Sequence, residues 1–222
     1  MKFGSMKHGS LSFPEIIIES RKDMDLHAPE WEVKTVSPWG DGMIFHLERL
    51  NSVSPVSGET HEFVRLRARE WITIVAFTDD GRLLLVVQYR HGASLPFVEF
   101  PAGLAEEGED PALAARRELL EETGMEPETL IPIGKVWANP AFMTNQCHTF
   151  LALGCKPVAE LNLDENEELT PVLMKVENFQ SAMDRGLIDN SMCVCAWHWY
   201  QCWLKNSGEM TPGDDSVNSN RG

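Results

Sequence analysis

Residues 103–125 read GLAEEGEDPALAARRELLEETGM, and this stretch decides the interpretation of the whole chain. It places Glu118, Glu121 and Glu122 at offsets of three and four residues, which lie on one face of an α-helix. Three like charges on one face destabilise a helix unless something neutralises them. Carboxylate oxygens are the ligands that Mg²⁺ and Mn²⁺ prefer, so the spacing predicts a helix that holds a divalent cation.

The residues that flank these carboxylates favour the same helix. Asp110 suits the N-cap, Pro111 suits the first helical position, and Gly124 suits a left-handed C-terminal cap. Arg117 lies four residues before Glu121 and can form an ion pair with it. A solvated surface helix is the ordinary alternative for two adjacent glutamates, so the choice depends on the wider pattern.

That wider pattern has fixed spacings on both sides of the helix. Five residues separate Gly103 from Glu109, seven separate Glu109 from Arg117, and the stretch then reads RELLEETGM. This is a complete match to G-x5-E-x7-R-E-U-x-E-E-x-G-U, where U is apolar. The chain therefore resembles a Nudix hydrolase. The resemblance implies hydrolysis of a nucleoside diphosphate that is linked to another moiety, with Mg²⁺, or alternatively Mn²⁺, as the cofactor.

The resemblance also implies roles for individual residues of this box. Glu118 and Glu122 would be the principal metal ligands, Glu121 a further ligand or a contact to water, and the carbonyl oxygen of Ala102 an additional ligand. Bound cations would stabilise negative charge on phosphate oxygens and activate water. Gly103 would let the backbone approach the metal closely, and Glu109 and Arg117 would orient the box.

Motifs outside the box resemble the branch of the family that hydrolyses ADP-ribose and other nucleoside diphosphate sugars. They are VQYR at 87–90, EFPAG at 99–103, Pro140 about fifteen residues beyond the box, and the acidic loop 164–168. Pro140 would contribute to substrate binding. The broader resemblance spans about residues 60–205, and it makes a nucleotide sugar the expected substrate.

Four side chains outside the box are candidates for contacts with that substrate. Arg90 would hold a phosphate, because a guanidinium group suits bidentate phosphate contacts. Glu99 would bind a hydroxyl group or help to orient the site, and Arg67 would add positive charge. Glu165, in the acidic loop, is the expected general base, with Glu167 as the alternative.

One segment departs from the pattern of this branch. Residues 139–148 read NPAFMTNQCH, where relatives often carry Ser-Pro-Gly-Phe and a following acid. The missing acid leaves the terminal moiety open, so GDP-mannose and dinucleotides stand as alternatives to ADP-ribose. His148 could contact substrate or pair within a strand. A nucleotide-sensing module without catalysis is disfavoured, because no carboxylate of the box is missing.

Composition and charge limit the class of protein. The chain has 222 residues, 43% hydrophobic and 24% charged, as is ordinary for a soluble globular protein. Its apolar runs are too short to cross a bilayer. A formal charge of −15 argues against binding to nucleic acid or to a membrane surface. The odd number of cysteines, five, fits a reduced compartment, and the first residues lack an export signal, so we expect a cytoplasmic protein.

The distribution of strand-like and helix-like segments predicts an α+β fold. We expect an α/β/α sandwich, the Nudix fold, with a small N-terminal β-rich appendage. Residues 1–12 are expected to be a tag or a disordered start, 13–60 the appendage, 61–205 the Nudix domain, and 206–222 a disordered tail. Within the domain, strands are expected at 62–77, 83–89, 97–100, 131–137, 148–153 and 170–176. Helices are expected near 177–185 and 189–204.

The appendage is expected to hold two apolar strands. They would span 31–36 and 43–50, with a turn at 38–42 between them. A sheet this small is marginal alone, so we expect it to pack on the main domain or to form a homodimer. Its candidates for stacking on a nucleotide base are Trp31, Trp39 and Phe45.

Overall fold

The structure is a computed structural model, and it describes residues 31–42, 44–163, 168–208 and 212. Contacts group the chain into two compact units: residues up to 37 with 49–63, and residues 38–48 with 64 onward. The predicted start at 1–12 and most of the predicted tail lie outside the described residues. In the described part, no helix is both long and apolar enough to cross a membrane.

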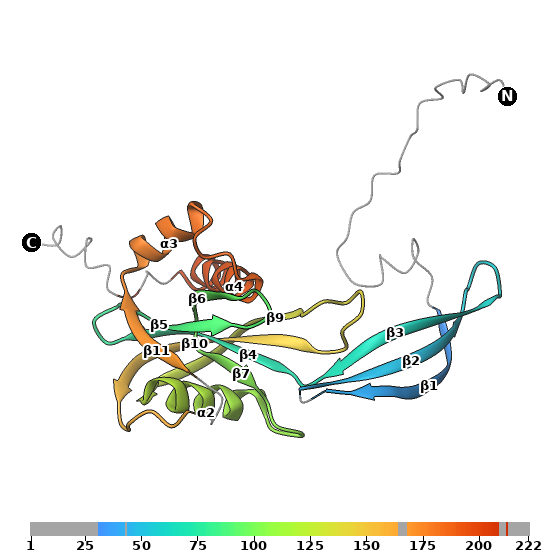
Figure 1. The fold of residues 1–222 in the computed structure, drawn as a ribbon. Coiled ribbons are helices and arrows are strands. Elements are labelled where there is room, and N and C mark those ends of the chain that lie inside the picture. The colour runs from blue at the N-terminus through green and yellow to red at the C-terminus, as the bar shows by residue number, and fades with distance from the viewer. Residues whose placement is uncertain (1–30, 43, 164–167, 209–211, 213–222) are drawn as a thin grey trace, which may run out of the picture. The chain divides into compact units, whose positions relative to one another are not determined.

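A three-stranded sheet forms near the beginning of the described chain (Figure 1). Its order is β1 (Glu32–Asp41), β2 (Phe45–Val53) and β3 (Thr60–Ala68). The predicted turn at 38–42 is wrong for residues 38–41, because β1 continues to Asp41; Gly42 lies beyond the strand, and its N–H donates to the carbonyl of Phe45. Proline is tolerated in an edge strand, where its missing N–H is not needed, so Pro38 does not end β1.

A mixed eight-stranded sheet forms the centre of the larger unit (Figure 1). The path is β11-β5-β4-β10-β8, with β6 beside β5, β7 beside β4 and β9 beside β10. Strands β4 and β10 run parallel, whereas the pairs β10–β8, β10–β9, β11–β5, β4–β5, β4–β7 and β5–β6 are antiparallel. The strand bounds are β4 (Trp71–Thr78), β5 (Leu83–Arg90), β6 (Leu95–Glu99), β7 (Ala102–Leu104), β8 (Met125–Glu126), β9 (Thr129–Trp137), β10 (Gln146–Pro157) and β11 (Leu169–Met174).

Helices cover both faces of this sheet (Figure 1). Helix α2 (Pro111–Thr123) packs on one face, and α3 (Val176–Asp184) and α4 (Ser191–Ser207) pack on the other. Strand β4 supplies both cores, because successive side chains point to opposite faces. Ile72 and Ile74 belong to the α2 core, whereas Val75 and Phe77 belong to the α3–α4 core. The expected α/β/α sandwich is thus confirmed.

The predicted elements differ from the observed ones mainly where strands are short or adjacent. The expected strand at 62–77 is two strands, β3 and β4, and the two-to-three-residue strands β7 and β8 were not predicted because so few residues show no periodicity. Helix α4 begins at Ser191, two residues after the expected start at 189, and Asn190 caps it: its side-chain oxygen accepts from the N–H of Met192.

Candidate active site

Helix α2 carries the box carboxylates, and both of its predicted ends are confirmed. Asp110 accepts a hydrogen bond from the N–H of Ala112 at 2.7 Å. Gly124 has φ +67° and donates its N–H to the carbonyl of Leu120, so the helix closes with the left-handed cap that favours glycine. The face between these caps buries Glu118 and Glu122, which are 8% and 2% exposed.

These carboxylates line a pocket of about 490 Å³. Strand β7 contributes all three of its residues to the lining, β5 and β6 contribute polar residues, and the beginning of α4 contributes Met192 and Cys193. The polar and backbone lining comprises Arg69, Thr73, Gln88, Arg90, Glu99, Ala102, Gly103, Glu106, Arg117, Glu118, Glu121, Glu122 and Asn190. The fold therefore brings the box together with two of the predicted substrate-binding residues, Arg90 and Glu99.

The guanidinium group of Arg117 forms hydrogen bonds with three glutamates of the box. Its Nε and Nη2 donate to the two carboxylate oxygens of Glu109 at 3.1 and 2.9 Å. Its Nη1 donates to Glu118 at 2.8 Å and to Glu121 at 3.1 Å. The hydrogen bond from Arg117 holds the pKa of Glu109 below its usual value, and the backbone N–H of Glu106 lowers it further. Arg117 is thus held by an ionised partner while it contacts two of the proposed metal ligands.

The backbone at 102–103 lies directly against the other carboxylates. The N–H of Ala102 donates to Glu122 at 3.0 Å. A Cβ atom at Gly103 would lie 2.0–2.3 Å from the carboxylate atoms of Glu118. Only a glycine leaves room for this close approach, so the backbone of β7 and the carboxylate of Glu118 share one small space.

The donor set fits a hard divalent cation. Carboxylate oxygens and a backbone carbonyl are oxygen ligands of the kind that Mg²⁺ and Mn²⁺ take. Among the described residues, no group of three or more His, Cys, Asp or Glu side chains is already arranged to hold a metal ion. The Arg117 guanidinium instead contacts Glu118 and Glu121. A cation that binds here competes with Arg117 for these carboxylates.

Arg90 and Glu99 form a second polar group in the same pocket. The Nε and Nη2 atoms of Arg90 donate to one oxygen of Glu99 at 2.9 and 2.6 Å, and the side chain of Asn190 donates to the other oxygen at 2.5 Å. The Glu99 residue is only 2% exposed. Since both of its oxygens are engaged by protein donors, the contacts favour the orienting role predicted for Glu99 over the binding of a hydroxyl group.

Two predicted substrate-binding residues lie away from this pocket. Arg67, on β3, pairs with Glu48 at 2.9 Å, and Arg65 pairs with the same carboxylate, where its hydrogen bond lowers the pKa of Glu48. Pro140 is exposed in the turn that precedes β10. Neither Arg67 nor Pro140 lines the pocket among the described residues.

The remaining candidates have mixed outcomes. The Nε2 atom of His148 lies 3.0 Å from a carboxylate oxygen of Glu70, so His148 has a partner within the protein, which favours that alternative over a contact with substrate. Trp31 packs edge-on against Phe63 with ring centroids 5.5 Å apart, whereas Trp39 is 56% exposed. The predicted general bases, Glu165 and its alternative Glu167, lie outside the described residues.

Sequence reasoning gave no pocket role to several residues that line it, among them Gln88 and Asn190. Gln88 shares a face of β5 with Arg90, two residues on, so alternation along the strand could have indicated it. Its buried Oε1 atom has no hydrogen-bond partner among the described residues. Asn190 could not have been found this way, because its partner Glu99 lies 91 residues earlier in the sequence.

The comparisons with known proteins agree with this geometry. Residues 66–191, over half of the chain, match the model of the NUDIX domain. The chain belongs to the Nudix family. As the complete box would suggest, it is a Nudix hydrolase, an enzyme.

Several named relatives are similar to this Nudix chain. An ADP-ribose pyrophosphatase of Mycobacterium tuberculosis is 32% identical over 156 residues, which cover 69% of this chain and 74% of the relative. Another of Bacillus subtilis is 38% identical over 97 residues, covering 43% and 52%. A methanol dehydrogenase activator of Bacillus methanolicus is 29% identical over 154 residues, covering 69% and 83%.

A solved structure supports the fold. The crystal structure of an ADP compounds hydrolase aligns with a TM-score of 0.71 and 24% identity, covering 82% of this chain and 97% of the other. At this level of identity the likeness establishes the Nudix fold and leaves the substrate to chemical reasoning.

Proposed function

We propose that this Nudix hydrolase cleaves the pyrophosphate bond of ADP-ribose or a related nucleoside diphosphate sugar. The products would be a nucleoside monophosphate and a sugar phosphate. The observation that carries the proposal is the pocket that joins the box carboxylates to Arg90. The relatives named ADP-ribose pyrophosphatase, at 32% and 38% identity, support the class of substrate.

Some residues of the box would bind the metal ion, and others would orient the metal ligands. Glu118, Glu121 and Glu122, with the carbonyl of Ala102, would hold Mg²⁺, or Mn²⁺ in its place. When bound, the cation supplies charge neutralisation at phosphate oxygens and acidifies water. Arg117 would orient Glu118 and Glu121 through the contacts described above. Glu165 remains the proposed general base, with Glu167 as the alternative.

An anionic substrate needs local positive charge in a protein of net charge −15. The pocket supplies it, since Arg69, Arg90 and Arg117 all line it. Arg90 is the best placed of these for a phosphate group. Arg117 is already engaged with three glutamates, whereas the side chain of Arg90 is 43% exposed and, among the described residues, pairs with Glu99 alone.

Three substrates are candidates for this pocket: ADP-ribose, GDP-mannose and a dinucleotide. Residues 139–148, which depart from the sequence pattern of the branch, do not distinguish between these substrates, because in the described chain they contribute no residue to the pocket. A regulatory role is a second candidate, favoured by the relative that is named an activator. The complete set of box carboxylates argues against a module that regulates without hydrolysis.

A hydrolysis panel tests the proposed function. With Mg²⁺ we expect ADP-ribose to give AMP and ribose 5-phosphate, nucleoside triphosphates to react far more slowly, and EDTA to abolish turnover, because the carboxylates then lack their counter-charge. Mass analysis of both products formed in ¹⁸O water would locate the attacked phosphorus. Rapid release of pyrophosphate from triphosphates, with ADP-ribose and GDP-mannose untouched, would contradict the proposal.

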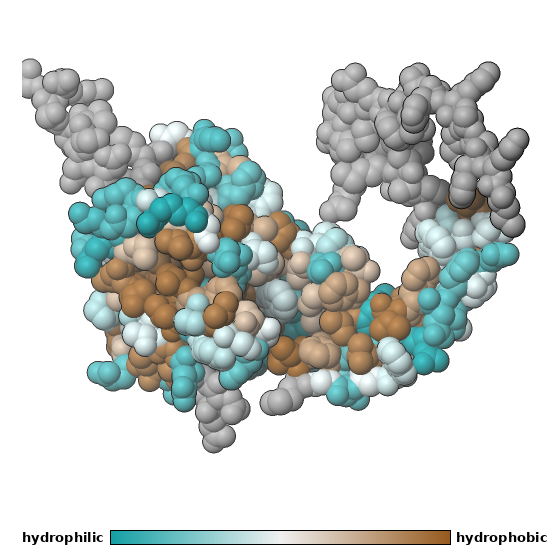
Figure 2. Space-filling view, turned by 45° about the horizontal axis from the view of Figure 1, so that its top comes forward, coloured by the Kyte–Doolittle hydropathy of each residue, from teal (hydrophilic) through white to brown (hydrophobic). Residues whose placement is uncertain are grey.

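We also propose that the chain forms a homodimer through residues 13–60. The three-stranded sheet exposes large hydrophobic side chains, and Figure 2 shows brown side chains on the surface of this part of the chain. The exposed ones include Val33, Val36, Trp39 and Val56. Light scattering should give about twice the chain mass of 25.0 kDa. A monomer at micromolar concentration would contradict the dimer, and a dimer that survives deletion of 1–60 would place the interface elsewhere.

A further inference from the structure

The carboxylate of Glu99 is buried and held from two sides. Its residue is 2% exposed, and a buried carboxylate is costly unless its oxygens are paired and hydrogen-bonded. One oxygen, Oε2, accepts from both Nε and Nη2 of Arg90 at 2.9 and 2.6 Å. The other, Oε1, accepts from the side-chain amide of Asn190. Three donors from two residues thus satisfy this group.

The resulting geometry at Arg90 is unusual for an arginine–carboxylate pair. The common arrangement sets two parallel N–H groups against two carboxylate oxygens. Here both donors of Arg90 converge on Oε2, while Asn190 engages Oε1. Within the described chain, the Nη1 atom of Arg90 makes no hydrogen bond, and the side chain is 43% exposed. This arrangement leaves donors of the guanidinium group directed away from Glu99.

The amide of Asn190 is itself fixed at both ends. Its Oδ1 accepts the N–H of Met192 at 2.8 Å and so caps α4, while its Nδ2 donates to Glu99. These two neighbours, a donor and a carboxylate, determine which end of the amide is oxygen and which is nitrogen. Helix α4 is anchored in the core through Cys193 and Trp197. Asn190 therefore connects a firmly packed helix to the Arg90–Glu99 pair.

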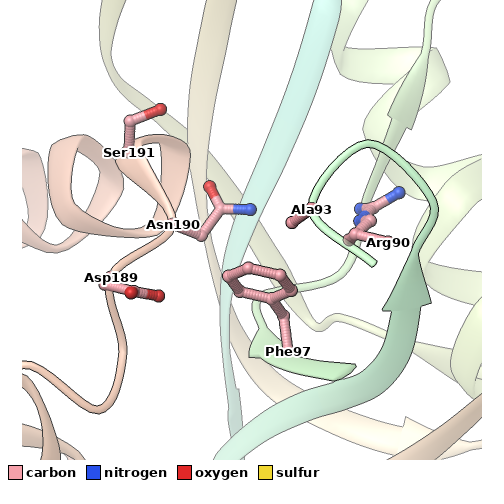
Figure 3. A pocket seen from close by; sticks show the side chains of 6 residues that line it. All are labelled: Arg90, Ala93, Phe97, Asp189, Asn190 and Ser191. Atoms are coloured by element: carbon pink, nitrogen blue, oxygen red, sulfur yellow. The ribbon is translucent and has the colours of Figure 1, made fainter. Parts of the chain in front are cut away.

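Asn190 also lies where two pockets meet. Together with Arg90 it lines both the pocket that contains the box carboxylates and a shallow pocket of about 320 Å³. In Figure 3 the amide of Asn190 extends from the beginning of α4 toward the side of the pocket that carries Arg90. Any rotation of the guanidinium group would therefore change the wall that faces the box carboxylates.

We propose that Asn190 is a positioning residue for Arg90. By occupying one oxygen of Glu99, it prevents Arg90 from pairing with both oxygens and keeps the remaining guanidinium donors available to a substrate phosphate. Its effect on substrate rests on the proposed function, since that function supplies the phosphate. Its effect on the geometry of Arg90 does not.

The substitution Asn190→Asp tests this role directly. It keeps the shape and the capping oxygen, but it replaces the donor to Glu99 with a second carboxylate oxygen. We expect KM for ADP-ribose to rise about tenfold or more near pH 8, as befits loss of a hydrogen bond to a charged group, with a smaller change in kcat. The defect should shrink toward about pH 5.5, because two facing carboxyl groups hold a proton more tightly and the proton restores a donor.

Ser191→Asp is the matched control. It adds the same charge one residue later, at a side chain that lines the shallow pocket but not the pocket of the box carboxylates, so it should change KM far less. Asn190→Ala removes the cap as well as the donor, and it should also lower Tm by about 2–4 °C. If Asn190→Asp left KM unchanged, or if Ser191→Asp raised it equally, the positioning role would be overturned.

Two further measurements separate this role from the proposed function. In an Arg90→Ala background, Asn190→Asp should alter KM by less than about twofold, because the two residues act as one unit. An equal effect in both backgrounds would overturn the inference. The NMR resonance of the Arg90 Nε–H, assigned with Arg90→Ala, should move in Asn190→Asp without any substrate. An unmoved resonance refutes the positioning role, whereas absence of ADP-ribose hydrolysis in the unaltered protein refutes only the proposed function.

Discussion

Glu118→Gln and Glu122→Gln are each expected to lower turnover by about a hundredfold or more while the fold survives. Each substitution keeps the size of the side chain and removes one negative charge. Both residues lie in the pocket at 8% and 2% exposure, where a charge interacts strongly because little water screens it. Loss of one electrostatic contact at a reacting centre typically costs about 10² to 10³ in rate.

The measurement is kcat with saturating Mg²⁺, with circular dichroism as the check on folding. Glu126→Gln is a matched control, because Glu126 is exposed on β8, just beyond the same helix, and loses the same charge. It should retain nearly full activity. Rates near that of the unaltered enzyme for Glu118→Gln or Glu122→Gln would remove that residue from the reacting centre.

The parts of the molecule that the sequence predicts well are those with short-range causes. Asp110 and Gly124 end helix α2 through contacts within a few residues, so their types and positions are sufficient. The single face that carries Glu118 and Glu122 follows from the geometry of one helix. The two buried faces of β4 follow from alternation along one strand, once helices cover both sides of the sheet.

The parts that the sequence does not predict depend on contacts between distant segments. The Asn190–Glu99 hydrogen bond joins residues 91 apart, and no local pattern specifies it. Arg67 has the charge expected of a phosphate ligand, but β2 places Glu48 beside it. Arg117 was expected to pair with Glu121, yet it also contacts Glu109, which the strand β7 and the following loop bring against the helix. In each case the partner is selected by the fold.

Gly103→Ala is expected to lower turnover about a hundredfold with little loss of stability. A Cβ atom at this position would lie 2.0–2.3 Å from the carboxylate of Glu118, which is the flexible end of a side chain and can move. The backbone of Gly103 is not in the left-handed region, so alanine adopts its conformation without strain. The cost therefore falls on the position of Glu118, and a displacement of about 1 Å at a reacting centre can lower the rate about 10²-fold.

The free energy of unfolding separates this effect from damage to the fold. Gly→Ala at a compatible backbone position contributes about 0.4–1 kcal/mol of stability through the unfolded chain, which offsets the cost of moving Glu118. Gly92→Ala is the control, because no atom of the described residues beyond its chain neighbours lies within 4 Å of a Cβ there, and both activity and stability should be kept. A Gly103→Ala enzyme that is fully active would show that Glu118 need not stay where β7 holds it, whereas one that is inactive and unfolded would point to packing instead.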